Sequence, residues 1–422
     1  MHMPKKLTQY YIDEKRRVLD KCQECGICAN ECPIIKQTEL KDVAPGAIQK
    51  AIKAYLQTGE VSSTVFGRAF SCMECFKCVD KCCPNGLNPM LVNELVKWEY
   101  SQNKIVEATY QDPQGEQSPQ RVIASIQVSH DEYGKIFSTT EISDAKFVFF
   151  PGCNVYFQPE KILNALNIMS LIGEYFAFVA GLDFCCGNTH LLYGSIDKAE
   201  RASEHLVQKL ASYHPETVIL WCPTCLCRFH TTLPHTLDLP FETMSFPQFL
   251  AKNVEKLPFK RSICKTATLH EACKVAFTGL DLDGPRQLLQ KIPGITLIEM
   301  PRHGKNTACC GSGAEDYFPK SFEAVRDDRL IEASQTPTEL LVDVCHYCHN
   351  LFVSQESKYQ FSVTNYVNLV AEALGIGRED KFKKYKQWRD MDQIVEDAKE
   401  FIRSSPFPRE TVVDLIESIF CH

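Results

Sequence analysis

The sequence lacks the features of several large protein classes. It has no excess of positive charge, because 46 Lys and Arg residues stand against 53 Asp and Glu residues and the net charge is −7. A protein that binds nucleic acid usually needs a basic face, so we expect no nucleic-acid partner. No G-x-G-x-x-G or G-K-[ST] loop occurs, and the sequence therefore gives no sign of a bound dinucleotide or nucleotide.

Long apolar runs are missing as well. Residues 1–6 lead straight into charged positions and form no apolar core of a signal peptide. The most apolar stretch, Ile162–Phe184, contains polar residues such as Glu174 that would be costly in a bilayer, so it predicts a buried helix followed by a strand. We expect a soluble cytoplasmic protein, either free or attached to the inner face of the membrane through a partner protein.

The abundant residue is cysteine, with 22 copies gathered in four dense clusters. A reducing cytoplasm makes a disulfide framework improbable, so these thiols are predicted to be metal ligands. Closely spaced thiolates are soft ligands suited to iron–sulfur clusters. The first two groups share the spacing C-x-x-C-x-x-C-x-x-x-C and consist of Cys22, Cys25, Cys28 and Cys32, and of Cys72, Cys75, Cys78 and Cys82.

Two cubane [4Fe–4S] clusters are predicted from these eight positions. In two-cluster ferredoxins the fourth cysteine of each run binds the cluster of the other run. One cubane would therefore take the first three cysteines of run one with Cys82, and the other the first three of run two with Cys32. Pro33 follows Cys32, whereas Pro84 follows Cys83, so Cys83 is the alternative to Cys82, which the spacing favours. A pair of zinc sites would not need this crossed pattern.

The other two groups follow a different pattern, C…C-C-G…C-x-x-C. Each offers five thiolates, one more than a cubane or a tetrahedral zinc ion uses, and this surplus suits a larger and more open cluster. The alternative is a structural zinc site that uses four of the five. The glycine after each cysteine pair is predicted to let the chain pass close to sulfur. The residues are Cys153, Cys185, Cys186, Cys222 and Cys225, and Cys273, Cys309, Cys310, Cys345 and Cys348.

These two groups belong to an internal duplication. Matching cysteines are offset by 120, 124 and 123 residues, which indicates a repeated module. Each copy alternates strands and helices, which predicts parallel α/β units with the cysteines at the strand ends, where open α/β sheets bind ligands. The predicted strands are 147–150, 176–179, 217–220, 267–269, 296–299 and 340–344, and the predicted helices are 160–175, 196–213, 285–292 and 321–333.

The predicted fold class is α/β with a helical ferredoxin-like start. We place an α-helical ferredoxin-like domain at 1–100 (helices 7–22 and 46–56), a weakly structured linker at 101–145, two cysteine-rich modules at 146–258 and 259–365, and a helical tail at 366–422. The basic and aromatic run Lys381–Arg389 in this tail either docks an acidic partner or a membrane surface, or forms a solvated helix face.

The order of two ferredoxin-type motifs followed by two C-C-G modules resembles that of heterodisulfide reductase. It is similar to the D-type form, in which the electron-transfer and catalytic parts are fused in one chain. Iron–sulfur subunits of glycolate oxidase and anaerobic glycerol-3-phosphate dehydrogenase share this layout. The resemblance covers about residues 22–350. It implies that each module holds a noncubane [4Fe–4S] cluster, one of which zinc could replace, and that a disulfide is cleaved between the two. All ten module cysteines are present, which favours this catalytic role.

The resemblance implies an anaerobic oxidoreductase that works as one subunit of a larger complex. Electrons would pass through the cubanes to the module clusters and reduce a small disulfide or related substrate. The alternative is a pure electron-transfer subunit that links a flavoprotein dehydrogenase to quinone or another carrier. A zinc-stabilised scaffold would leave the ferredoxin half without a purpose. Since the chain has no flavin or nicotinamide motif, we expect a flavoprotein or cytochrome-type redox protein as partner.

Histidines crowd the modules and could supply protons, because an imidazole titrates near neutral pH. Each could instead donate a hydrogen bond to cluster sulfur or lie exposed. These histidines are His190, His230, His270, His346 and His349. Three further cysteines lie outside the pattern and are interpreted as incidental thiols, namely Cys227, Cys264 and Cys421.

Overall fold

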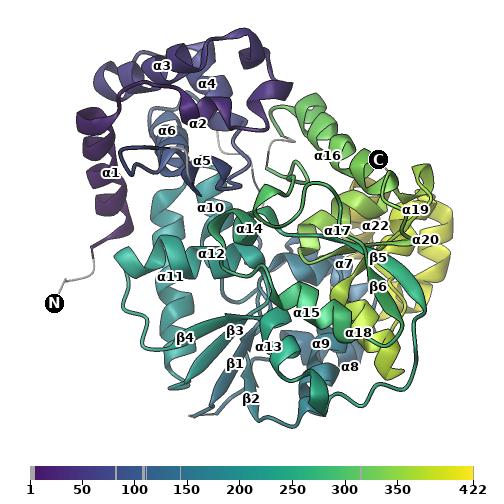
Figure 1. Ribbon diagram of the computed structural model, residues 1–422. Helices are drawn as coiled ribbons and strands as arrows, with labels where there is room; N and C mark the ends of the chain where they lie inside the picture. Colours follow the sequence, from purple (N-terminus) through teal and green to yellow (C-terminus); the bar gives the residue numbers. More distant parts are fainter. Residues whose placement is uncertain are drawn as a thin grey trace.

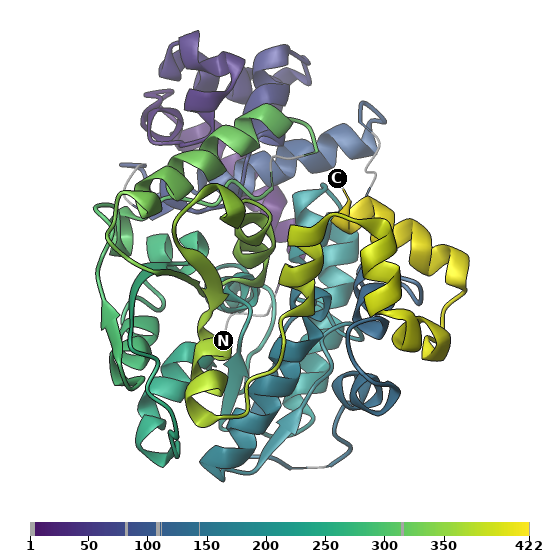
Figure 2. The ribbon, with the colours of Figure 1, turned by 90° about the vertical axis from the view of Figure 1, so that its right-hand side faces the viewer.

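The computed structural model describes residues 5–80, 83–106, 110, 112–142, 144–313 and 316–421. A helical N-terminal region lies at one end of two parallel α/β units, and a helical tail packs along their flank (Figures 1 and 2). This confirms the predicted fold class. Within the described ranges, no helix is both long and apolar enough to cross a membrane.

The N-terminal region is built from helices joined by the cysteine runs. Its first helix, α1, packs against α6, and the buried Tyr11 hydroxyl of α1 donates a hydrogen bond to the Glu94 carboxylate of α6. Both helices that the sequence predicted here are confirmed. The helices are α1 (Leu7–Lys21), α2 (Ile27–Asn30), α3 (Pro45–Thr58), α4 (Ser63–Phe70), α5 (Lys77–Asp80) and α6 (Pro89–Gln102), with 3-10 turns at Ile35–Gln37 and Glu39–Asp42.

The buried carboxyl of Glu94 gives the first prediction. Burial raises the pKa of Glu94 from 4.5 to about 7, and the charge of Glu74 adds to the shift. The unfolded chain loses this proton near pH 4.5 while the folded chain keeps it to about pH 7, so Glu94 increasingly destabilises the fold as pH rises between these values. Glu94→Gln should therefore raise the free energy of unfolding at pH 8 by about 1–3 kcal/mol, with a smaller gain at pH 6.

The measurement is anaerobic thermal unfolding of both proteins at the two pH values. Glu99→Gln on the same helix is the matched control, because Glu99 pairs with Lys15 at 2.6 Å and its loss should lower stability. An equal effect of Glu94→Gln at pH 6 and pH 8 would contradict the assignment of a raised pKa.

Each module contains a four-stranded parallel sheet, and the two sheets have the same strand order. The first runs β2-β1-β3-β4 and the second β6-β5-β7-β8. The strands are β1 (Phe147–Phe150), β2 (Phe176–Phe178), β3 (Thr217–Leu220), β4 (Glu242–Ser245), β5 (Lys265–His270), β6 (Ile295–Leu297), β7 (Leu340–Asp343) and β8 (Ser362–Asn365). The six predicted strands are confirmed. The edge strands β4 and β8 were not predicted, because their half-polar sequences carry no apolar run.

The helices of the two modules pack against each other as well as on their own sheets. Helix α13 contacts α15, and one apolar core includes Phe149 and Trp221 from the first module and Leu269 and Val342 from the second. The modules are therefore joined by a shared core. Their helices are α9 (Pro159–Ile172), α10 (Asn188–Leu192), α11 (Ile196–Ala211), α12 (Pro223–Thr231), α13 (Phe246–Lys252), α14 (Cys273–Thr278), α15 (Gly284–Lys291), α16 (Pro319–Ser334), α17 (His346–Val353) and α18 (Tyr366–Leu374).

The segment 101–145 corrects one expectation. It was predicted to have weak structure, but it carries two helices, α7 (Pro119–Ser125) and α8 (His130–Phe137). Val122 and Ile123 of α7 are fully buried, and a capping box between Ser129 and Glu132 begins α8. The polar composition hid these helices because both are short, because several buried positions of α7 are polar, and because α8 has one buried residue.

The C-terminal tail adds α19 (Lys381–Trp388), α20 (Met391–Asp397), α21 (Lys399–Ser404) and α22 (Arg409–Phe420), drawn in yellow in Figure 2. In the basic run, Phe382 and Tyr385 are buried, and Lys381 and Lys384 both pair with Asp397 at 2.8 and 2.7 Å. Much of the charge of this run is therefore neutralised within the tail, and two of its three aromatic residues belong to the core, whereas Trp388 is exposed.

Candidate functional site

All ten module cysteines line one cleft between the two modules, with a volume of about 180 Å³. They reach it because each lies beyond the carboxyl end of a parallel strand, either in the connecting loop or in the first turn of the following helix. Cys222 and Cys345, for example, follow β3 and β7 and are the N-cap residues of α12 and α17. The duplication thus brings two equivalent sets of five thiols to one cleft.

Within each module the five thiols follow one another in the same order. In the first, Cys186 contacts the thiols of Cys185 and Cys225, and those in turn contact Cys153 and Cys222. In the second, the Sγ atoms of Cys309 and Cys273 lie 3.6 Å apart and those of Cys348 and Cys310 lie 3.2 Å apart. The complete second series is Cys273, Cys309, Cys310, Cys348 and Cys345.

Glycines make this crowding possible. The amide groups of Gly187 and Gly311 donate to the Sγ atoms of Cys185 and Cys309 at 3.3 and 3.4 Å, as expected for a chain that passes close to sulfur. Both glycines have positive φ, and a Cβ on Gly187 would lie 2.6 Å from a backbone oxygen of α11. The glycine of the C-C-G pattern is therefore required by backbone packing as well as by the approach to sulfur.

The cysteines of the ferredoxin half form two groups in space. Cys22, Cys25 and Cys28 line one pocket together with Cys83. Cys32 instead interacts electrostatically with the second run, Cys72, Cys75 and Cys78, which are all buried. This placement of Cys32 is the one that crossed ligation requires. Cys82 lies outside the described residues.

Cys83 gives the second prediction. Since it lines the same pocket as Cys22, Cys25 and Cys28, Cys83→Ser should remove the first cubane, with loss of about four irons per chain. Iron analysis and EPR of the reduced protein check this. Cys264→Ser, at an exposed thiol outside the pattern, is the control and should keep all its iron. If Cys82→Ser loses the cubane and Cys83→Ser keeps it, the spacing argument for Cys82 is correct.

The two cysteine runs share an unusual backbone. Glu24 and Gly26 in the first run have φ of 56° and 74°, and Glu74 and Phe76 at the matching positions of the second have 49° and 70°. A left-handed conformation is unfavourable for residues other than glycine. The second run therefore has two strained residues, Glu74 and Phe76, whereas the first run has one, Glu24, because Gly26 adopts this conformation without strain. The sequence offered a signal, since Gly26 marks a position that needs positive φ.

Buried N–H donors show that the thiols fit clusters. Gln49 Nε2 donates to Cys28 Sγ at 2.6 Å, and Arg68 Nη1 donates to Cys32 Sγ at 3.4 Å. The atoms Arg68 Nε and Nη2, Arg228 Nη1 and Nη2, and His270 Nε2 are buried without a partner in the part of the chain that the structure describes. Buried donors are rarely left unpaired, and cluster sulfur beside each would satisfy them. None of these donors except His270 was predicted.

One polar group joins the ferredoxin half to both modules at the cleft. Glu74 lies between the predicted cubane ligands Cys72 and Cys75, and its Oε2 accepts from Asn188 Nδ2 at 2.9 Å and from Lys274 Nζ at 3.3 Å. Asn188 follows the first C-C-G, and Lys274 follows the first cysteine of the second module. All three side chains line the cleft, so the ferredoxin half supplies part of its wall.

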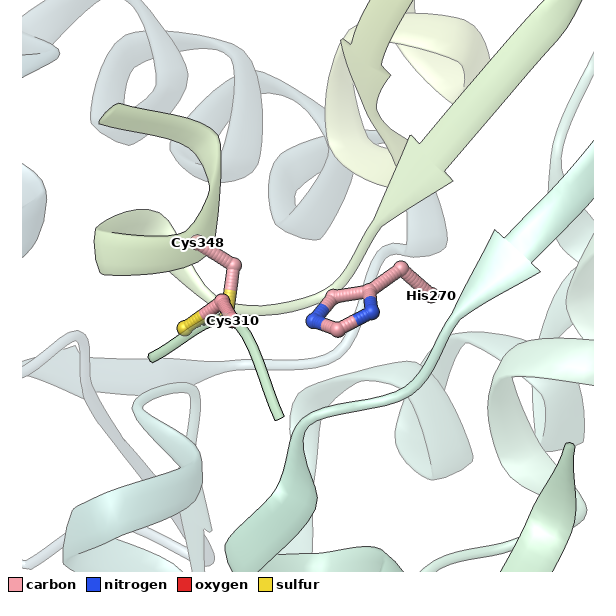
Figure 3. Close-up of side chains that lie close together, drawn as sticks. All are labelled: His270, Cys310 and Cys348. Carbon is pink, nitrogen blue, oxygen red and sulfur yellow. Dashed lines mark hydrogen bonds between the residues drawn. The ribbon is translucent and has the colours of Figure 1, made fainter. Parts of the chain in front are cut away.

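Of the five histidines named from the sequence, His346 alone lines the cleft. It packs edge-on against Trp221 at 4.6 Å, and burial lowers its pKa well below the usual range, so its imidazole is neutral. His190 and His230 hydrogen-bond to hydroxyl groups of residues that do not line the cleft. His270 lies behind the thiols of the second module, where Figure 3 shows its ring facing Cys310 and Cys348.

His349 has a structural role. Its Nδ1 lies 2.7 Å from Asp343 and its Nε2 lies 3.0 Å from Asp380, which also pairs with the buried Lys161. Asp380 is the N-cap residue of α19, so this network fastens the tail to both modules. A proton-supply role for His349 in the cleft is therefore wrong, because both ring nitrogens face carboxylates away from it.

Comparison with known proteins agrees with this geometry. A family model described as a cysteine-rich domain matches residues 147–230 and 267–352, and one described as a 4Fe-4S dicluster domain matches residues 18–87. The D subunit of dihydromethanophenazine:CoB–CoM heterodisulfide reductase from Methanosarcina barkeri is 26% identical over 393 residues, which cover 85% of this chain and 94% of the relative. The chain is an iron–sulfur protein similar to the D subunits of heterodisulfide reductase, with a 4Fe-4S dicluster domain and two cysteine-rich domains.

Other relatives extend the comparison. The corresponding D-type protein of Methanosarcina mazei is 27% identical over 403 residues, with the same two shares. The B subunit of fumarate reductase (CoM/CoB) from Methanothermobacter marburgensis is 24% identical over 355 residues, which cover 80% of this chain and 68% of that protein. The chain is thus an iron–sulfur electron-transfer oxidoreductase with a dicluster domain and two cysteine-rich modules.

Proposed function

We propose that the chain reduces a disulfide in the cleft between its two modules, as one subunit of a larger redox complex. The observation that carries this proposal is the single cleft onto which all ten module cysteines open. Two equivalent thiol sets in one cleft can each hold one half of a cleaved substrate. The relatives support this choice, because the names of the heterodisulfide reductase and the fumarate reductase proteins both refer to the thiols CoM and CoB.

The ligand sets suit four clusters. The two cysteine runs would hold two cubane [4Fe–4S] clusters with crossed fourth ligands, and each set of five thiols a noncubane [4Fe–4S] cluster. When bound, these clusters supply one-electron carriers and iron with affinity for the sulfur of a substrate. Zinc in one module is the alternative. His270 cannot serve such a zinc site through Nε2, because Arg329 donates to Nδ1 and the ring proton therefore lies on Nε2.

The first cysteine run lies near the surface and the second is buried close to the second module. This arrangement favours electron delivery through the N-terminal region. Cys25 is exposed, and its neighbour Ile27 is an exposed apolar residue with 43% of its surface accessible. The second run is buried, and Cys75 interacts electrostatically with Cys273 and Cys309 of the second module. A flavoprotein or cytochrome-type partner would therefore dock near Cys25, and electrons would reach the cleft through the second module.

The cleft side chains would bind the substrate and its products. Cleavage of R–S–S–R′ to two thiols takes two electrons and two protons. The Lys274 ammonium faces the cleft beside Cys273, where its N–H groups can donate to a departing thiolate. Glu74 and Asn188 hold that ammonium in place, so the ferredoxin half orients a substrate-binding group as well as delivering electrons.

The test combines composition with turnover. Protein purified under anaerobic conditions should contain about 16 irons per chain, four for each cluster, without stoichiometric zinc. Viologen-reduced protein should turn over small disulfides such as the mixed disulfide of CoM and CoB. If the protein instead exchanges electrons rapidly with a flavoprotein and a quinone but reduces no disulfide, the pure electron-transfer function is correct. Stoichiometric zinc would contradict a cluster in at least one module.

A further inference from the structure

The two modules repeat the same fold and the same five cysteines, but the side chains beside their thiols differ. Three residues before the first cysteine, the first module has Phe150 and the second has His270. Three residues after the last cysteine, the first module has Arg228 and the second has Leu351. At these two positions each module therefore has one nitrogen donor, and the two donors come from different elements. The second module also has the Lys274 ammonium beside Cys273, but its charge is paired with the Glu74 carboxylate at 3.3 Å.

In the second module the donor is a neutral imidazole with a fixed tautomer. His270 is fully buried at the end of β5, and its Nδ1 accepts a hydrogen bond from Arg329 Nε at 3.1 Å. A guanidinium only donates, so Nδ1 carries the lone pair and the proton lies on Nε2. Among the described residues Nε2 has no partner, and the ring lies in one group with the thiols of Cys310 and Cys348, whose ligand atoms are all within 4.8 Å (Figure 3).

Arg329 cannot easily turn away from His270. Its side chain is fully buried, and Nη1 donates to Glu332 and to the carbonyl oxygen of Arg302, both at 2.8 Å. A third nitrogen, Nη2, donates to Thr307 Oγ1 at 3.3 Å. With every nitrogen of the guanidinium bound, the tautomer of His270 is held by the fold.

In the first module the donor carries a permanent charge. Arg228 is 3% exposed on α12, one turn beyond Cys225, and its Nε donates to the carbonyl oxygen of Cys186 at 3.4 Å. Its Nη1 and Nη2 are buried and have no hydrogen-bond partner in the described part of the chain. A guanidinium stays protonated in proteins, so this module always has a cation beside its thiols.

We propose that Arg228 and His270 give the clusters of the two modules different reduction potentials, with the higher potential in the first module. Hydrogen bonds to sulfur and nearby charge set the potential of an iron–sulfur cluster. A buried cation stabilises an added electron more than a neutral N–H does, because Coulomb attraction is weakly screened there. An electron that enters at the second module, next to Cys75, therefore moves on to the first, and the second module can accept the next electron.

This inference rests on the proposed clusters, and its test distinguishes a failure of the inference from an absence of the clusters. Each of two variants imports the residue of the other module: Arg228→Leu and His270→Phe. Iron content and EPR signals of the reduced protein show whether the clusters are present. A redox titration followed by EPR then gives the potential of each signal, without any substrate.

Arg228→Leu should lower the reduction potential of the cluster that gives one module signal and leave that of the other cluster unchanged. The equilibrium constant for reduction should fall at least tenfold, which corresponds to about 59 mV for one electron. His270→Phe should lower the equilibrium constant for reduction of the other cluster by a smaller factor, about threefold. The proposal is overturned if neither variant shifts a potential, if both shift the same signal, or if the signal that Arg228→Leu shifts has the lower potential in the unmodified protein.

Conservative variants separate charge from loss of structure. Arg228→Lys keeps the cation, and Arg228→Gln keeps N–H donors but removes the charge, so only the second should lower the potential. His270→Gln keeps a neutral donor and should behave like the unmodified protein. Equal shifts from Arg228→Lys and Arg228→Gln would refute the role of charge, even if Arg228→Leu fails to fold. Absence of the module signals in the unmodified protein would instead count against the clusters.

Discussion

Replacement of Cys186 or of Cys310 by serine is expected to abolish disulfide reduction, by at least about 100-fold, because serine oxygen is a poor substitute for thiolate in binding iron. Each cysteine is the middle thiol of its series of five and lines the cleft, so its loss disrupts the cluster of that module. The predicted cubane ligands lie outside the two series, so we expect dithionite still to reduce both cubanes. Turnover with reduced viologen and cubane EPR measure the two effects.

Cys227→Ser provides the matched control. Cys227 is as buried as Cys186 and lies on α12 two residues beyond Cys225, but it does not line the cleft. This variant should keep most of the activity. If Cys186→Ser or Cys310→Ser keeps near-full turnover, the corresponding module is not catalytic.

Replacement of Cys32 by serine is expected to remove the second cubane and to leave the first in place. Cys32 lies in the first run, yet it interacts with Cys72, Cys75 and Cys78, and Arg68 donates to its sulfur. The second run is the one whose Cys75 lies near the second module, so electron delivery to the cleft should fall by orders of magnitude. Two measurements check this: EPR that resolves the two cubanes, and turnover with an electron donor that delivers electrons to the first cubane.

The pairing of Cys32 is tested by which cubane is lost. Loss of the first cubane together with an intact second one would show that each run binds its own fourth cysteine. Cys421→Ser, at a thiol of the C-terminal tail outside the pattern, should leave both cubanes and the rate unchanged.

The repeated part of the fold could be predicted because its strands are short apolar runs that end at cysteines. β1 and β3 lie at the predicted residues, and α11 begins at the predicted Ile196. The strands β4 and β8 could not be found this way, since their half-polar sequences contain no apolar run, unlike those of the other edge strands β2 and β6. Short helices such as α7 are also hidden, because seven residues give too little periodicity to recognise.

For the site, spacing identified the thiols but not the groups around them. Arg228 could have been found, since a residue three positions beyond Cys225 on a helix shares its face. Gln49 and Arg68 could not, because they reach Cys28 and Cys32 from helices 21 and 36 residues away. Proximity in sequence also misled: His349 follows Cys348 directly, but the helix turns its ring toward Asp343 and Asp380.

The contact between Glu74 and Lys274 limits how the protein can be divided. Lys274 is 13% exposed and Glu74 1%, so this ion pair is largely shielded from water. A fragment that begins after the ferredoxin half would retain the ammonium without its carboxylate, and loss of one partner of a buried pair typically destabilises by about 3–5 kcal/mol. The two modules, although they share their own core, are therefore expected to be a poor independent fragment, and we expect removal of the ferredoxin half also to deform the cleft between them.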